Sequence, residues 1–225
     1  MILDLFSSAN TVNVVHRLKT LSTRQANSST LVYELESIQH PSQLFPVFHD
    51  MTHPVFLDGA MPDGCGKQFS YITADPFLVI RSRGRRITLK YDSTCENIED
   101  DPWSVLQDLL HRYNVRQIPE LPSFQGGALG YWGYDLGRHL EKLPSWADDD
   151  LQLPEMYLGF YDWALAYDGD TGKTLLFSTG LPEGTITRAQ ARADQIMACI
   201  ANKKLAVDTP RFYASEYMES NFTSD

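Results

Sequence analysis

The stretch FQGGALGYWGYDLGRHLEKLP, residues 124–144, holds five of the fourteen glycines of the chain, with Tyr131, Trp132 and Tyr134 among them. A dinucleotide-binding fingerprint needs glycines at i, i+2 and i+5, between a strand and a helix. No three glycines of the stretch have that spacing, which excludes a phosphate-cradling loop of this kind. The spacing instead predicts a buried strand that is poor in side chains, which another backbone or an aromatic ring can approach closely. A strand that lines a ligand is the alternative.

The whole chain has 225 residues and a net charge of −10. A nucleic-acid binder would need a basic surface, so the charge argues against that class. No apolar run approaches the ~18 residues of a membrane-spanning helix, so we expect no membrane association. The three cysteines are far apart and include no C-x-x-C. This pattern is typical of a reducing, cytoplasmic location and excludes a cysteine-rich zinc site.

Three regions are expected along the chain. Residues 1–29 are rich in Ser and Thr, which is typical of a poorly ordered extension and also of a transit peptide. Residues 30–205 are predicted to form the folded domain, and residues 206–225 a tail with no clear period. No internal repeat or low-complexity linker divides the chain.

Local patterns within the folded region predict mostly hairpins and a few helices. Pro41 opens a short helix that Pro46 should bend, and Asp101 with Pro102 begins a confident amphipathic helix. Such a pattern favours an α+β fold with a largely antiparallel, sandwich-like β-sheet and about three helices. The expected strands cover 29–37, 53–60, 67–73, 77–91 as a hairpin, and 155–179 as two strands, and the expected helices cover 40–50, 101–115 and 185–204.

The hairpin at 77–91 carries five basic side chains, which allow two interpretations. They could bind a phosphate, or they could lie on the solvent face of a sheet and prevent pairing with other chains. We expect the solvent face. These residues are Arg81, Arg83, Arg85, Arg86 and Lys90.

Residue chemistry alone indicates no catalytic mechanism and no metal site. The chain has no G-x-S-x-G nucleophile motif and no H-E-x-x-H zinc motif. Asp135 and Glu141 are six positions apart and could act as an acid–base pair, but no predicted helix aligns them.

The glycine-rich stretch does resemble a known family. It is similar to the block F-x-G-G-x-x-G-x-x-G-Y-D-x-x-R-x-x-E in the N-terminal region of the chorismate-utilising enzymes. The matching positions are Phe124, Gly126, Gly127, Gly130, Gly133, Tyr134, Asp135, Arg138 and Glu141.

The resemblance extends over about residues 30–225. LVYELE near the start and the segments within 56–76 follow the family's order. The Asp-Leu-Gly-Arg form, the Leu143-Pro144 ending and the stretch LPEMYLGFYDWALAYD resemble the aminodeoxychorismate branch, whose enzymes replace the C4 hydroxyl of chorismate with an amino group for 4-aminobenzoate and folate synthesis. Anthranilate synthase component I, of tryptophan biosynthesis, is the alternative branch.

The resemblance implies partners rather than chemistry within this chain. In the family, a chorismate-binding domain holds Mg²⁺ and the chorismate carboxylates, and a separate glutaminase subunit delivers ammonia. The reactive lysine of the aminodeoxychorismate branch lies in a P-I-K-G-T segment, which this chain lacks. We therefore expect no catalytic residue and no cofactor in this chain, and no activity from it alone.

A tryptophan-type pocket is the one ligand site that the resemblance places here. Its segments align with Phe56, Leu57, Asp58 and Gly59, and with Gln68, Phe69 and Ser70. Gly59 replaces the family's Ser and Gln68 replaces its Arg, so two donors suited to a ligand carboxylate are lost. A structural remnant is thus expected. A stand-alone tryptophan-type binding or interaction module without catalysis is the other alternative.

Overall fold

The structure is a computed structural model, and it describes residues 29–35, 41–59, 68–142, 144 and 149–202. The expected tail at 206–225 and nearly all of the expected extension at 1–29 lie outside the described residues. The described elements, in chain order, are β1 (Leu31–Leu35), α1 (Pro41–Leu44), the 3-10 helix η1 (Phe45–Phe48), β2 (Val55–Leu57), β3 (Phe69–Thr73), β4 (Leu78–Arg83), β5 (Arg86–Tyr91), β6 (Cys95–Glu99), α2 (Pro102–Arg112), β7 (Gly127–Trp132), the 3-10 helix η2 (Tyr134–His139), β8 (Met156–Tyr161), β9 (Trp163–Asp168), β10 (Thr174–Ser178) and α3 (Ile186–Asn202).

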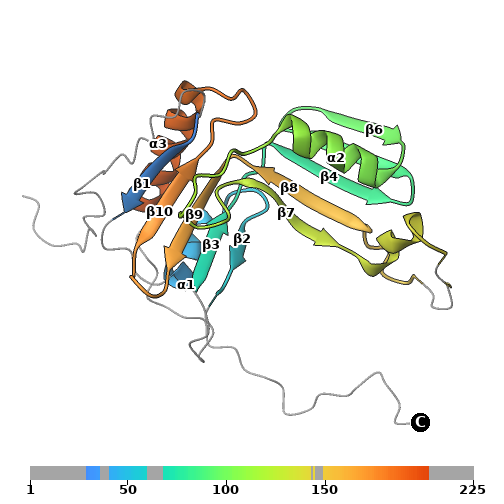
Figure 1. Cartoon of the computed structure of the whole chain (residues 1–225), viewed down its shortest axis with the longest axis horizontal. Helices are drawn as coiled ribbons and strands as arrows, with labels where there is room; N and C mark the ends of the chain where they lie inside the picture. The colour runs from blue at the N-terminus through green and yellow to red at the C-terminus, as the bar shows by residue number, and fades with distance from the viewer. Residues whose placement is uncertain (1–28, 36–40, 60–67, 143, 145–148, 203–225) are drawn as a thin grey trace, which may run out of the picture.

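The strands form two five-stranded antiparallel sheets. The first sheet has the order β1-β10-β9-β3-β2, and the second has the order β6-β5-β4-β8-β7. Figure 1 shows the sheets beside one another, with α3 against the first and α2 against the second. The predicted α+β fold with largely antiparallel pairing is therefore confirmed.

The first sheet buries one face beneath α1, η1 and α3. Ala193, Ile196 and Ile200 of α3 lie at helical spacing and face Trp163 and Leu165 of β9. The indole nitrogen of Trp163 donates to the carbonyl of Ala74, at 2.8 Å, so this large buried ring leaves no polar group unsatisfied. The predicted helix at 185–204 is confirmed.

The opposite face of the first sheet is partly covered by the segment that follows α2. Ile118 and Leu121 pack there against Val32, Ala166 and Phe177. The buried amide of Gln125 accepts from the backbone N–H of Ile118 and donates to its carbonyl, at 2.9 and 3.0 Å. These two hydrogen bonds hold the segment against the sheet, although the segment has no regular secondary structure.

The second sheet buries its core beneath α2. Leu106 and Leu109 of the helix pack on Ile80, Leu158 and further apolar residues of β4, β5 and β8. The α2 helix starts as predicted. The opposite face carries the exposed Arg81, Arg86 and Lys90, which confirms the solvent-face interpretation of the hairpin.

One expectation about strands is wrong, and one strand was not predicted. The first strand predicted within 155–179 is in fact β8 and β9, which belong to different sheets and are separated by Asp162. The apolar run continues across this boundary because both halves are buried, so it gives no sign of the change. β6 was not expected, since its sequence CENIE is mostly polar and lies exposed at the sheet edge.

Candidate functional site

The glycine-rich stretch forms β7 and η2. β7 is an edge strand, and its residues are half-buried or exposed, so the expectation of a buried strand is wrong. The expected close approach of another backbone does occur, but the approaching backbone is that of β8 in this chain. A Cβ atom on Gly130 would lie 2.0 Å from the carbonyl oxygen of Tyr157 and 2.9 Å from the Cα of Leu158. Gly126 has φ +118°, and a Cβ there would meet Tyr161 and Thr179.

Three further signature positions form an ion pair or a ring contact within the described part of this chain, and Tyr134 does not. Asp135 forms an ion pair with Arg138 at 2.8 Å, one turn apart in η2, rather than an acid–base pair with Glu141. Phe124 packs edge-on against Tyr71, with ring centroids 5.9 Å apart. Tyr134 is almost fully exposed. These contacts give the block a structural role and leave its aromatic surface open.

His139 joins η2 to two other elements of the second sheet. Its ring nitrogens lie 3.9 Å from Asp101, the N-cap of α2, and 3.6 Å from Glu155. Glu155 in turn accepts from the backbone N–H of Gly84, in the β4–β5 turn, at 3.0 Å. The signature stretch is therefore anchored to the same frame as the helix and the hairpin.

The structure brings the two predicted ligand segments together. β2 pairs with β3, with Leu57 opposite Tyr71. The Ser70 hydroxyl donates to Asp58 at 3.2 Å and accepts from the backbone N–H of Gly59 at 3.1 Å. Ser70 is thus already engaged by the residues beside it.

The remaining predicted ligand residues have other contacts. Phe56 stacks on Phe45 with centroids 5.5 Å apart, and Phe69 contacts Tyr71 at 6.3 Å. Leu57 is largely exposed. The Gln68 carbonyl accepts from Gly169 at 2.8 Å, at the turn between β9 and β10.

Gly59 is incompatible with the serine that the family resemblance would place there. A Cβ at this position would lie 2.1 Å from the carbonyl oxygen of Phe69. A serine would therefore require the backbone of β3 to move. The local packing thus excludes a side chain at Gly59, and with it the hydroxyl of the family's serine.

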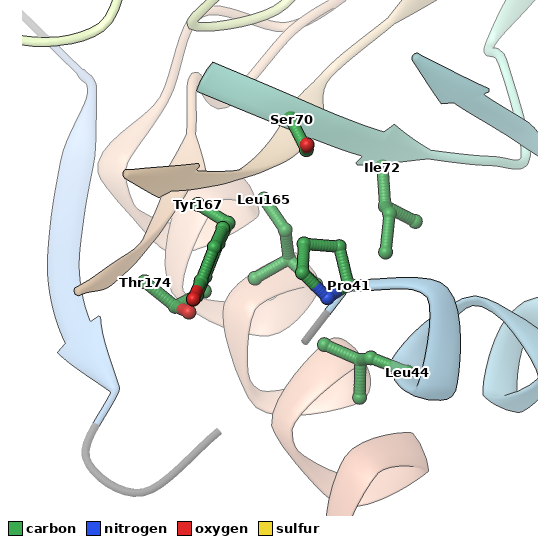
Figure 2. A pocket seen from close by; sticks show the side chains of 7 residues that line it. All are labelled: Pro41, Leu44, Ser70, Ile72, Leu165, Tyr167 and Thr174. Atoms are coloured by element: carbon green, nitrogen blue, oxygen red, sulfur yellow. The ribbon is translucent and has the colours of Figure 1, made fainter. Parts of the chain in front are cut away.

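A small cavity lies beside these segments, between the first sheet and α1. Figure 2 shows Ser70 at its edge, with the side chains of Tyr167 and Thr174 on the sheet and those of Pro41 and Leu44 on the helix. Its volume is about 10 Å³, which is room for one water-sized molecule. The buried Thr174 hydroxyl has no hydrogen-bond partner among the described residues, so a polar guest would suit this cavity. An indole ring does not fit without rearrangement.

A buried ion network connects the two sheets with α3, and sequence reasoning missed it. Asp162, fully buried between β8 and β9, accepts from Arg192 Nε at 3.0 Å. Arg192 also donates to Asp75 at 2.7 Å and to Gln195 at 2.9 Å. Arg192 interrupts the apolar stripe of α3, and this interruption was the available signal.

The network perturbs the ionisation of its members. Burial raises the pKa of Asp162, and the guanidiniums of Arg192 and Arg188 oppose that rise. Burial alone would lower the pKa of Arg192, but Asp162 and Asp75 raise it above its ordinary value. Arg192 is therefore a permanent cation that holds the buried carboxylate in place.

The part of the chain that the structure describes shows neither a metal-ligand cluster nor a membrane-spanning helix. No three His, Cys, Asp or Glu side chains gather there as metal ligands. No described helix is long and apolar enough to cross a membrane.

Comparisons with known proteins find two groups of relatives. Aminodeoxychorismate synthase component 1 of Klebsiella aerogenes is 34% identical over 146 residues, which cover 64% of this chain and 32% of the relative. Anthranilate synthase component 1 of Acetivibrio thermocellus is 31% identical over 157 residues, covering 69% and 32%. Aminodeoxychorismate synthase component 1 of Escherichia coli K12 is 42% identical over 103 residues, covering 45% and 22%. The chain thus spans about a third or less of the length of these relatives.

Further comparisons add little to these. No family model matches the chain. The crystal structure of anthranilate synthase component I from Streptococcus pneumoniae TIGR4 superposes with a TM-score of 0.49 at 22% identity, covering 72% of this chain and 36% of that one. The sequence similarities, together with the signature block on β7 and η2, identify the chain as a partial domain of the chorismate-utilising enzyme family.

Proposed function

We propose that the chain is the N-terminal region of an aminodeoxychorismate synthase component I, the subunit that aminates chorismate to 4-amino-4-deoxychorismate on the route to 4-aminobenzoate and folate. The observation that carries this choice of branch is the 42% and 44% identity, each over 103 residues, with the enzymes of Escherichia coli and Salmonella typhimurium. The anthranilate synthase of Acetivibrio thermocellus reaches 31% over 157 residues.

In this proposal the chain supports the chemistry and does not perform it. The lysine of the P-I-K-G-T segment, Mg²⁺ and the chorismate carboxylates would all be held by a chorismate-binding domain outside this chain. A glutaminase subunit would supply ammonia. The exposed aromatic residues of β7 and η2, Tyr131, Trp132 and Tyr134, are suited to pack against that domain, since an apolar surface of this kind is costly to leave in water.

Anthranilate synthase component I is the second candidate, because the relative from Acetivibrio thermocellus matches a longer segment of this chain than the Escherichia coli enzyme does. The tryptophan-type binding module is less favoured. The cavity beside Ser70 has a volume of about 10 Å³, far too small for an indole, and Gly59 cannot carry the hydroxyl of the family's site.

Two matched chimeras test the choice of branch. Residues 31–202 replace the aligned segment in Escherichia coli aminodeoxychorismate synthase component 1 and, separately, in the Acetivibrio thermocellus anthranilate synthase component 1. Each chimera is assayed with its own glutaminase, chorismate and glutamine, and the products are separated by chromatography. We expect the first chimera to retain most of its activity and the second to lose most of it. The reverse result would assign the chain to anthranilate synthase.

A further inference from the structure

A second, larger cavity lies between α3 and the connection from β3 to β4, away from the segments that resemble a tryptophan site. Its volume is about 300 Å³, at the lower end of the range for small-molecule sites. Its walls are mainly polar or charged, with one aromatic ring. The lining side chains that matter here are Asp75, Phe77, Asp92, Arg188, Arg192 and Gln195.

The back of this cavity is formed by groups that are already paired. Arg192 is buried and bonds to Asp162, Asp75 and Gln195 at 2.7 to 3.0 Å. Arg192 already bonds to both carboxylates, so Arg192, Asp75 and Asp162 provide a rigid wall rather than a free binding group.

Arg188 lies one helical turn before Arg192 and is incompletely paired. Its guanidinium is 3.5 Å from Asp162 and 3.6 Å from Glu183, longer than the 2.7–2.9 Å typical of a charge-assisted hydrogen bond. Its Nε is buried and has no hydrogen-bond partner among the described residues. A buried donor without an acceptor is unfavourable, and a ligand carboxylate would satisfy it with the bidentate geometry that arginine prefers.

Asp92 lines the same cavity from the turn after β5. It is exposed, and no described residue forms an ion pair or hydrogen bond with its side chain. It does not pair with Arg188 either. The cavity therefore presents one incompletely paired cation and one unpaired anion at separate positions.

We propose that this cavity binds a small zwitterion of the α-amino acid class. The carboxylate of the ligand would pair with Arg188, its ammonium group with Asp92, and its side chain would contact the ring of Phe77. A simple anion would leave Asp92 of the same cavity unpaired, and a simple cation would leave Arg188 without a further acceptor. The proposal does not depend on which synthase the chain belongs to.

Three probes that share one aromatic group test the charge requirement. L-Phenylalanine carries both charges, 3-phenylpropionate only the carboxylate, and 2-phenylethylamine only the ammonium group. Each is titrated into the full chain by isothermal titration calorimetry at millimolar concentrations. We expect L-phenylalanine to bind, and we expect the affinity of each of the other two probes to be lower by about tenfold or more. No binding by any probe, or equal binding by 3-phenylpropionate, would overturn the proposal.

Two substitutions locate the site. Arg188→Gln and Asp92→Asn should each weaken L-phenylalanine binding about tenfold or more, while Arg85→Gln and Asp170→Asn, which remove exposed charges elsewhere, should leave it unchanged. Thermal unfolding of each variant shows that the fold is kept. If L-phenylalanine still binds after both cavity substitutions, the ligand lies elsewhere and the assignment is refuted. Loss of L-phenylalanine binding in Ser70→Ala, with binding kept in the two cavity variants, would place the ligand at the smaller cavity and would refute it too.

Discussion

Gly130 determines how closely β7 approaches β8. A methyl group at this position would overlap the carbonyl oxygen of Tyr157, 2.0 Å away, and backbone cannot yield as a flexible side chain can. We predict that Gly130→Ala lowers the free energy of unfolding by about 3 kcal/mol, measured by urea denaturation. Gly133→Ala is the matched control, because its nearest neighbour is 3.3 Å away, and it should cost less than about 1 kcal/mol. Equal midpoints for the two variants would contradict this account.

Arg192 compensates the buried charge of Asp162. We predict that Arg192→Leu destabilises the protein by about 3–5 kcal/mol at neutral pH, whereas Arg81→Leu on the open face has little effect. Burial already raises the pKa of Asp162, and loss of the guanidinium raises it further. The folded-state pKa then exceeds the unfolded value, so the penalty disappears below the ordinary pKa of 3.8 and grows as the pH rises above it. A penalty that does not vary between acid and neutral pH would refute this explanation.

At the scale of elements, the α2 helix depends on its N-cap. The Asp101 carboxylate accepts from the backbone N–H and the hydroxyl of Ser104, both at 2.8 Å, and these bonds lower its pKa. We predict that Asp101→Ala costs about 1 kcal/mol at neutral pH, while Asp108→Ala on the exposed face of α2 costs less. Because the folded-state pKa is depressed, the contribution is complete above pH 3.8 and is lost as the pH falls through the lowered pKa. Chemical denaturation at several pH values measures it.

The elements that could be predicted are those whose signals are local. Asp101, Pro102 and the apolar spacing of α2 lie within a few positions of each other, and so do the turn and strands of the 77–91 hairpin. The division between β8 and β9 could not be predicted, because both strands are buried and apolar and their separation depends on which distant strands they pair with. β6 is held by pairing with β5 rather than by its own residues.

The candidate sites follow the same rule. Asp58, Gly59 and Ser70 meet because β2 and β3 follow one another in the sequence and pair, so their proximity could be predicted. The steric exclusion of a side chain at Gly59 could not, since it depends on the exact position of the Phe69 carbonyl. Arg192 interrupts the apolar stripe of α3, but its partner Asp75 lies 117 positions away, and nothing in the sequence identifies that partner.

On the scale of the whole molecule, the open surface of β7 and η2 should make the chain associate. Tyr134 and Leu140 are 87% and 73% exposed, close to the exposed Trp132. We predict that the full chain forms concentration-dependent oligomers in light scattering, and that the double variant Tyr134→Ser/Leu140→Ser reduces them. Leu110→Ser on α2 is the control and should not. A monomeric wild-type chain at all concentrations would contradict this prediction.

In the proposed function, the chain supports chorismate chemistry that other residues perform. The most direct test of this claim combines the full chain with the remaining C-terminal part of Escherichia coli aminodeoxychorismate synthase component 1, in the presence of chorismate, ammonium and Mg²⁺. The native N-terminal fragment serves as the positive control. We predict no 4-amino-4-deoxychorismate from the chain alone and clear formation from the combination. Product from the chain alone, or none from the combination while the native fragments succeed, would contradict the claim.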